Sequence, residues 1–117
     1  MFRISKTFSF SASHILEGLP PEHPCGRLHG HNYSVTFILQ GKTLNSVGFL
    51  RDYRELTQCK EWLDKAFDHQ HLNDMIRFNP TAELLAKYIF EIWKPTIFEL
   101  VAVSVQETEK TTATYEP

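Results

Sequence analysis

The sequence predicts a single α+β domain over residues 1–117, with helices on one face of an antiparallel sheet. Three observations predict this class: apolar residues alternate with period two near both ends of the chain, two helical stretches lie between them, and the length suits one domain. The expected element order is β-β-α-α-β-β. We therefore expect a four-stranded antiparallel sheet with the two helices segregated to one side.

Two strands are predicted in the first third of the chain. Residues 2–12 place aromatic and aliphatic side chains on one face and mostly serine or threonine on the other, and residues 29–40 alternate in the same way. The stretch 16–28 is rich in glycine and proline, which predicts a loop. We expect the strands to pair antiparallel around this loop, and an irregular stretch to follow over about 41–51.

The first helix is predicted over residues 53–67. Asp52 starts the sequence Asp-Tyr-Arg-Glu, which is typical of a capping box in which Glu55 bonds back to the cap. Apolar residues then recur at helical spacing and include Cys59, which we expect in the core. Trp62 lies one step off this stripe, so we expect it to be partly exposed.

The second helix is predicted over residues 80–94. Asn79 is its expected cap, and Pro80 suits the first helical position because its missing N–H needs no partner there. Two strands over 100–105 and 111–115, separated by a short turn, complete the chain.

Composition and charge exclude several classes of protein. The chain has 12 Lys and Arg against 14 Asp and Glu, a formal net charge of -2, so we expect no nucleic-acid partner. No apolar stretch approaches the roughly 20 residues of a membrane-spanning helix, and the N-terminus lacks the pattern of a signal peptide. With two cysteines, Cys25 and Cys59, we expect a cytoplasmic protein whose thiols are reduced.

Three histidines are candidates for a metal site. His29 and His31 are two residues apart at the start of a strand, so both imidazoles leave the same face, and His14 continues the apolar face of the preceding strand. If these strands pair, three neutral imidazoles meet; this ligand set suits Zn²⁺ and leaves a fourth position open. On spacing alone, ordinary polar histidines at strand ends explain the pattern equally well.

Cys25 lies in the loop that leads into these histidines, in the sequence Cys-Gly-Arg-Leu-His-Gly-His. A thiolate in this place can act as a base or a nucleophile. Two structural alternatives stay open: Cys25 as the fourth ligand of a closed zinc site, or as a small buried apolar residue.

Six short motifs occur in order along nearly the whole chain. They are Phe10-x-Ala12-x-His14, Cys25-x-x-x-His29-Gly30-His31, Gly48-x-x-x-Asp52-Tyr53, Asp68-His69-x-x-Leu72-Asn73, Asn79-Pro80-Thr81-Ala82-Glu83 and Val105-Gln106-Glu107-Thr108. Together they resemble the signature of the 6-pyruvoyl-tetrahydropterin synthase family. The three residues between Cys25 and His29 resemble its 6-carboxytetrahydropterin synthase branch, which serves 7-deazaguanine and queuosine biosynthesis.

This resemblance implies a zinc-dependent lyase. Its substrate would be 7,8-dihydroneopterin triphosphate, and its products 6-carboxy-5,6,7,8-tetrahydropterin, acetaldehyde and triphosphate. His14, His29 and His31 are then the zinc ligands, and the metal acts as a Lewis acid. The alternatives are a 6-pyruvoyl-tetrahydropterin synthase, which only eliminates triphosphate, and a non-catalytic zinc- or pterin-binding module.

The resemblance also assigns the other site residues. Cys25 would be the proton acceptor, and Asp68 with His69 would form a second acid–base pair. Glu107 would accept two hydrogen bonds from the pterin, and Thr108 would help orient its ring. From the residues alone, Asp68-His69 is better explained as a helix end with a favourably placed cation, and Glu107 as an ordinary solvated carboxylate.

Finally, the resemblance implies the tunnelling fold (T-fold) and its assembly. Trimers of this fold close a barrel, which removes the open edges of each sheet, and two trimers stack into a homohexamer. Active sites of the family lie at subunit interfaces. We therefore expect the metal ligands and the pterin anchor of one site to come from different chains, with no membrane partner.

Overall fold

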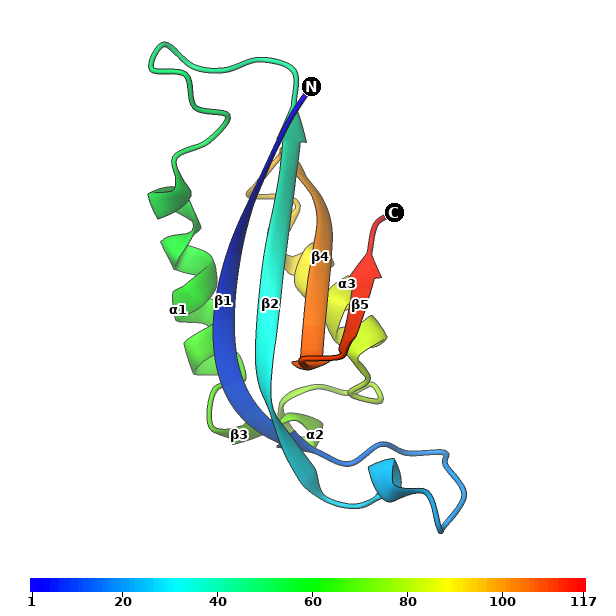
Figure 1. Cartoon of the computed structure of the whole chain (residues 1–117). Coiled ribbons are helices and arrows are strands. Elements are labelled where there is room, and N and C mark those ends of the chain that lie inside the picture. Colours follow the sequence, from blue (N-terminus) through cyan, green and yellow to red (C-terminus); the bar gives the residue numbers. More distant parts are fainter.

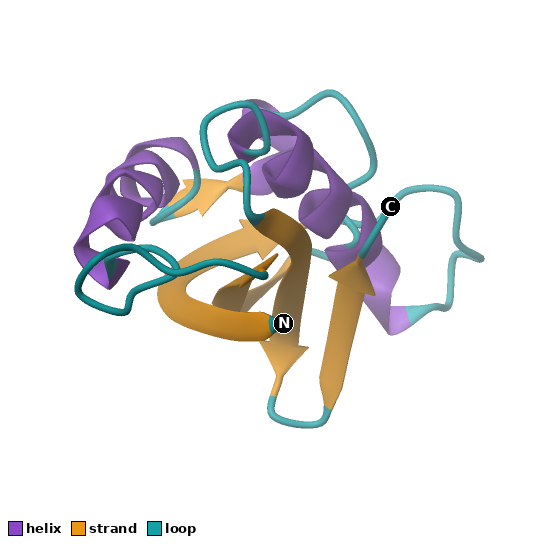
Figure 2. Cartoon of the chain, turned by 90° about the horizontal axis from the view of Figure 1, so that it is seen from above, coloured by secondary structure: helices purple, strands orange, loops and turns teal.

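The computed structural model describes residues 1–117 and contains one curved sheet with the helices on one face (Figure 1). The strand order is β3-β1-β2-β4-β5, where the strands are β1 Phe2–His14, β2 His29–Gly41, β3 Gln70–His71, β4 Leu100–Thr108 and β5 Thr111–Tyr115. Figure 2, turned by 90°, shows the helices gathered on one side of the strands. The predicted α+β class is confirmed.

The four long strands pair antiparallel, as expected. β1 and β2 are in register from Phe2 opposite Gly41 to His14 opposite His29. β1 therefore runs two residues beyond the predicted 2–12, and this extension places His14 on the sheet. β4 also continues past the predicted end at 105 and includes Glu107. Polar residues at these ends do not interrupt the backbone ladder, which explains why alternation alone ended both strands too early.

A fifth strand and a short helix lie between the two predicted helices. β3 pairs parallel with β1, with His71 opposite Ser13, so the sheet is mixed and has one strand more than the four predicted. The helix is α2, Leu72–Met75. Two strand residues and one helical turn are too short to show a hydrophobic period, which is why the sequence did not predict them.

The predicted helix 53–67 has two parts. It begins with the 3₁₀ turn η2, Tyr53–Leu56, and continues as α1, Thr57–Ala66. The predicted capping box is wrong. The Asp52 carboxylate accepts a hydrogen bond from the Arg54 N–H at 2.9 Å, but the Glu55 carboxylate turns away from the cap to pair with Arg51 Nη1 at 2.7 Å. The charge of Arg51 competes successfully with the neutral backbone N–H.

The second predicted helix starts later than expected. α3 spans Ala82–Trp93, and its cap is Thr81, whose hydroxyl accepts a hydrogen bond from the Leu84 N–H at 3.2 Å. The prediction of Asn79 as the cap is wrong, because its carboxamide binds the backbone of Glu17 instead. This contact joins the start of the α3 region to the chain that follows β1.

The core lies between the helices and one face of the sheet. It includes the fully buried side chains of Tyr33, Val35, Phe37, Leu39, Leu63, Leu85 and Ile89. Cys59 is buried among them, as predicted, and Trp62 is half-buried beside Phe67. The opposite sheet face carries hydroxyl pairs such as Thr7–Thr36, 2.8 Å apart. No helix of the chain has the length and apolar character needed to cross a membrane.

Candidate metal and active site

Three imidazoles converge at the end of the sheet where β1 and β2 leave the core. His14 is opposite His29 in the register, and His31 is opposite Ala12, so all three side chains leave the same face of neighbouring strands. One nitrogen atom from each ring lies within 4.8 Å of the corresponding atoms of the others. The convergence expected from the spacing is present.

Backbone carbonyls fix the tautomers of two of these rings. The Nδ1 of His14 donates to the Pro80 carbonyl at 2.8 Å, and the Nδ1 of His29 donates to the Arg27 carbonyl at 2.7 Å. A carbonyl oxygen can only accept, so each neutral ring carries its proton on Nδ1 and a lone pair on Nε2. Such partners also orient the rings of metal-binding histidines.

The two Nε2 atoms of His14 and His29 lie 2.9 Å apart and direct their lone pairs at each other. The Nε2 of His31 is buried and has no hydrogen-bond partner. Buried polar atoms in folded proteins are normally paired, so this cluster lacks an electron-pair acceptor. A tetrahedral cation with bonds of 2.0–2.1 Å separates its ligand nitrogens by roughly 3.3 Å. The donor set fits such an ion, and the 2.9 Å between the His14 and His29 nitrogens is close to this separation.

Burial disfavours the protonated form of two of these rings. It lowers the pKa of His14, against the opposing effect of the hydrogen bond to the Pro80 carbonyl. Burial also lowers the pKa of His31, against the opposing effect of the Glu107 carboxylate, whose Oε2 lies 3.7 Å from His31 Nε2. The hydroxyl of the buried Tyr33 lies 3.1 Å from His14 Nδ1, and burial raises its pKa, so it stays a phenol. Neutral imidazole is the form that binds metal.

Cys25 lies close to the clustered histidines in the sequence, but its sulfur is not part of the cluster of ligand atoms. It is part of the short 3₁₀ turn η1, Pro24–Gly26, and it is half-buried with a free thiol. Its N–H donates to His23 Nδ1 at 3.1 Å, and its carbonyl accepts from the Leu16 N–H at 3.0 Å. The convergent ligand atoms come from the three histidines, and the Cys25 sulfur is not one of them.

Asp68 and His69 form a hydrogen-bonded pair next to β1. The two oxygens of Asp68 bind the Ser11 N–H and the Nδ1 of His69, both at 2.9 Å. Both hydrogen bonds lower the pKa of Asp68, and the one from the Ser11 N–H has the larger effect. The His69 side chain is 82% exposed and hydrogen-bonds to none of the three clustered histidines. His69 also has φ of 58°, a left-handed conformation that costs free energy outside glycine and often occurs at functional sites.

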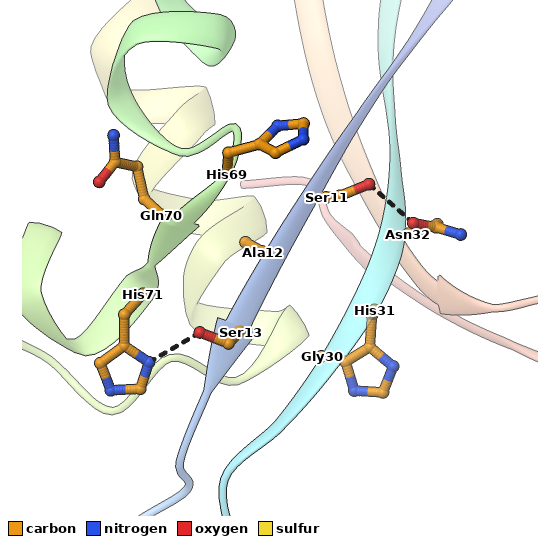
Figure 3. A pocket seen from close by; sticks show the side chains of 9 residues that line it. All are labelled: Ser11, Ala12, Ser13, Gly30, His31, Asn32, His69, Gln70 and His71. Carbon is orange, nitrogen blue, oxygen red and sulfur yellow. Dashed lines mark hydrogen bonds between the residues drawn. The ribbon is translucent and has the colours of Figure 1, made fainter.

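His69 lines a polar hollow that crosses β3, β1 and β2 (Figure 3). The other lining residues are Ser11, Ala12, Ser13, Gly30, His31, Asn32, Gln70 and His71. Figure 3 shows His71 pointing at Ser13, and its Nδ1 lies 2.9 Å from the serine hydroxyl. The Ser13–His71 pair was not predicted, because its geometry depends on the two-residue strand β3.

Glu107 lies beside His31 of the histidine cluster. It lies on β4, half-buried, and lines one hollow with the start of α3 and the threonines of β5, and a second with Asn32 and Thr108. The Thr108 hydroxyl lies 2.8 Å from that of Thr111 in the turn between β4 and β5. The predicted anchor and its neighbour are therefore adjacent to His31, whereas Asp68 and His69 lie on the other side of β1.

A sequence profile described as 6-pyruvoyl tetrahydropterin synthase matches residues 3–117. The chain belongs to this family. It is 31% identical to the 6-carboxy-5,6,7,8-tetrahydropterin synthase of Bacillus subtilis (strain 168), over 99% of this chain and 86% of that protein. It is 33% identical to the putative 6-carboxy-5,6,7,8-tetrahydropterin synthase of Archaeoglobus fulgidus, over 86% of this chain and 84% of that protein.

The fold agrees with that of a solved 6-pyruvoyl tetrahydropterin synthase from Caenorhabditis elegans. The two superpose with a TM-score of 0.87 and 28% sequence identity, over 99% of this chain and 95% of that one. In this member of the 6-pyruvoyl tetrahydropterin synthase family, five of the six sequence motifs lie around the end of the sheet where His14 pairs with His29, and the Gly48–Tyr53 motif lies at the other end. The five motifs supply the histidine cluster, Cys25, the Asp68–His69 pair and Glu107.

Sequence reasoning missed the groups that orient the clustered rings. The Pro80 carbonyl holds His14, and the Tyr33 hydroxyl lies beside the same ring. The Asn-Pro-Thr motif was interpreted as a helix start, and only the tertiary structure brings its proline carbonyl to a ring 66 positions earlier in the chain. Tyr33 continues the face that carries His29 and His31, so strand alternation was the one signal that could have indicated it.

Proposed function

We propose that this chain is a zinc-dependent lyase that converts 7,8-dihydroneopterin triphosphate to 6-carboxy-5,6,7,8-tetrahydropterin, acetaldehyde and triphosphate. The observation that carries the proposal is the cluster of three histidines whose ring nitrogens converge, with the buried Nε2 of His31 lacking any hydrogen-bond partner. It occurs in a chain that matches a 6-carboxytetrahydropterin synthase over 99% of its length. The pathway we propose is 7-deazaguanine and queuosine biosynthesis in the cytoplasm.

Zinc is the metal we propose for the three histidines. Their nitrogen donors suit it, and three protein ligands leave one position for a substrate oxygen, as in catalytic rather than structural sites. When bound, the ion would polarise oxygen atoms of the substrate side chain as a Lewis acid. The backbone bonds of His14 and His29 keep the rings oriented for this role.

Two protein groups are proposed to move protons. The Cys25 thiolate takes a proton from a side-chain carbon of the substrate, since it lies in the loop next to the cluster and is free of the ligand set. His69 acts as the second acid–base group. Asp68 accepts its Nδ1–H hydrogen bond, which orients the ring and leaves Nε2 to exchange a proton with the substrate.

Glu107 is proposed to bind the pterin. A carboxylate can accept hydrogen bonds from an amino group and a ring N–H side by side. Because Glu107 is half-buried beside His31 of the same chain, we propose that the anchor and the metal ligands of one site belong to one chain, in contrast to the expectation from the family. Thr108 would help to orient the ring from the end of the same strand.

We further propose a homohexamer made of two barrel-forming trimers. β5 has one neighbour in the sheet, and β1 is covered by β3 only at Ala12 and Ser13, so both outer edges have free backbone groups. Pairing between chains would satisfy these edges. We also propose that active sites are shared between subunits, with the exposed His69, which hydrogen-bonds to none of the clustered histidines of its own chain, serving the cluster of a neighbouring chain.

The product of the reaction tests this function. The purified protein, loaded with zinc, is incubated with dihydroneopterin triphosphate, and the pterin is identified by mass spectrometry while acetaldehyde is trapped as a hydrazone. We expect a carboxylated pterin and acetaldehyde in equal amounts. Release of triphosphate with an intact three-carbon side chain would instead establish a 6-pyruvoyl-tetrahydropterin synthase, the candidate that the similarity to the Caenorhabditis elegans protein favours. Binding of zinc or pterin without turnover would indicate a non-catalytic module.

A further inference from the structure

Two asparagine side chains hold the chain directly after His14. The Asn73 carboxamide accepts a hydrogen bond from the Ile15 N–H at 2.9 Å and donates to the Ile15 carbonyl at 2.8 Å. The Asn79 carboxamide does the same with Glu17, at 2.9 and 3.1 Å. Each side chain thus binds both backbone groups of one residue, as a neighbouring β-strand would.

The residue between these two contacts faces the other way. β1 ends at His14, so residues 15–17 have no strand partner of their own. In an extended chain, alternate residues direct their backbone groups to opposite sides. The Leu16 N–H accordingly points away from the asparagines and donates to the carbonyl of Cys25 at 3.0 Å. Residues 15–17 therefore lie between the asparagine pair and the loop that carries the thiol.

Both asparagines are attached to rigid parts of the protein. Asn73 follows the fully buried Leu72 at the start of α2. Asn79 precedes Pro80, whose carbonyl binds His14, and Thr81, which caps α3. One short segment of chain therefore fixes both the ring of a clustered histidine and the backbone that supports Cys25.

We propose that Asn73 and Asn79 are positioning residues, which act through residues 15–17 to place Cys25 relative to the three clustered histidines. Their side chains hydrogen-bond to the backbone of Ile15 and Glu17 and to neither the histidines nor the thiol. The chemistry of the carboxamide explains the choice of residue, because it supplies one donor and one acceptor side by side on a short stem. Aspartate lacks the donor, and alanine lacks both groups. The catalytic consequence rests on the proposed function of Cys25, but the structural role does not.

The test compares the variants Asn73→Ala and Asn79→Ala with Asn45→Ala. Asn45 is a matched control, because its carboxamide also accepts hydrogen bonds from two backbone N–H groups, those of Val47 and Phe49. It follows β2, which ends at Gly41 opposite Phe2, whereas His14 and His29 pair at the other end of these strands. Asn73→Ser and Asn79→Ser, which keep one hydrogen-bonding group, replace the alanine variants if those do not fold.

Three quantities are measured in each full-length variant: the alkylation rate of Cys25 by iodoacetamide, hydrogen exchange at the Leu16 amide, and zinc content. The buried Cys59 serves as an internal reference for global opening. We expect Cys25 alkylation and Leu16 exchange to rise about 10-fold in the Asn73 and Asn79 variants. Zinc content should stay near that of the wild type, and the Asn45 variant should match the wild type throughout.

Turnover supplies the readout that a purely structural role would not change. A misplaced reactive group lowers kcat, on the order of 10- to 100-fold for a displacement of about 1 Å, and leaves KM nearly unchanged. Unchanged Cys25 reactivity and Leu16 exchange would overturn the proposal, as would equal changes in the Asn45 variant. Faster alkylation with normal kcat would overturn its catalytic part. A different product, or none, refutes the proposed function instead, and the alkylation and exchange rates still decide the positioning role.

Discussion

His14 and His29 face each other through their Nε2 atoms at 2.9 Å, although each ring has already used its Nδ1 proton on a backbone carbonyl. Two opposed lone pairs at this distance repel unless an electrophile lies between them. The protein backbone therefore holds these rings in an arrangement that a bound cation completes. The unpaired Nε2 of His31 supplies the third donor.

Replacing any of these three histidines should abolish metal binding. We expect His14→Ala, His29→Ala and His31→Ala to reduce zinc, measured by plasma emission spectrometry after gel filtration, from about one ion per chain to nearly none. His69→Ala is the matched control, because it removes an imidazole outside the cluster and should keep its zinc. Full zinc occupancy in the His31 variant would contradict the proposed ligand set.

Replacing Cys25 should separate metal binding from chemistry. Because the thiol is not among the convergent ligand atoms, we expect Cys25→Ala to retain its zinc. Loss of an acid–base group should lower kcat on the order of 10²- to 10⁴-fold. Zinc content and turnover are measured on the same preparation, and Cys59→Ala controls for the loss of a thiol in general. A Cys25 variant that loses its zinc would indicate the closed four-ligand site.

Mixing two inactive variants should restore activity if the sites are shared between chains. Cys25→Ala retains the Asp68–His69 pair, and His69→Ala retains the thiol and the histidine cluster. If Cys25 and His69 of one site come from different subunits, random co-assembly makes about a quarter of the sites complete. We expect the co-refolded mixture to recover about that fraction of wild-type turnover. A mixture as inactive as its components would place both groups of a site on one chain.

Acid should destabilise the protein through Glu99. The side chains of Glu99 and Arg51 are 25% and 18% exposed, with Oε1 2.8 Å from Nη2. Burial alone would raise the pKa of Glu99, but the hydrogen bonds and charge of Arg51 outweigh it and lower the pKa below its ordinary value of 4.5. Because the pKa of Glu99 is lower in the folded than in the unfolded chain, its ionised form stabilises the fold at pH values above the unfolded-state pKa. This stabilisation is lost as the pH falls through the folded-state pKa.

We therefore expect Glu99→Gln to lower the free energy of unfolding by roughly 1–2 kcal/mol at pH 7. It should also reduce the loss of stability of the wild type below about pH 4.5. Urea unfolding between pH 3 and 7 measures both effects. Glu55→Gln, which breaks the more exposed pair with Arg51, should cost less than about 0.5 kcal/mol. Parallel pH profiles for wild type and Glu99→Gln would refute this role.

The α+β class, the pairing of the first two strands and the face on which the three histidines meet could all be predicted from the order of residues. These follow from local rules: period-two alternation places residues 14, 29 and 31 on one side once β1 and β2 pair. The positions of Cys25, Asp68 and Glu107 within motifs were also visible there, but their roles came from family resemblance. No local rule assigned a partner to these side chains.

The contacts that join distant segments became visible only in the folded chain. β3 is too short to carry a period, yet it places His71 against Ser13, and His69, which precedes the strand, is in a left-handed conformation. Asn79 was predicted as a helix cap because its sequence neighbours suit one, but its carboxamide instead binds a backbone 62 positions away, where a strand partner is missing. A polar side chain hydrogen-bonds to an unpaired group that lies near it in space. The spacing of residues along the sequence does not say which groups these are.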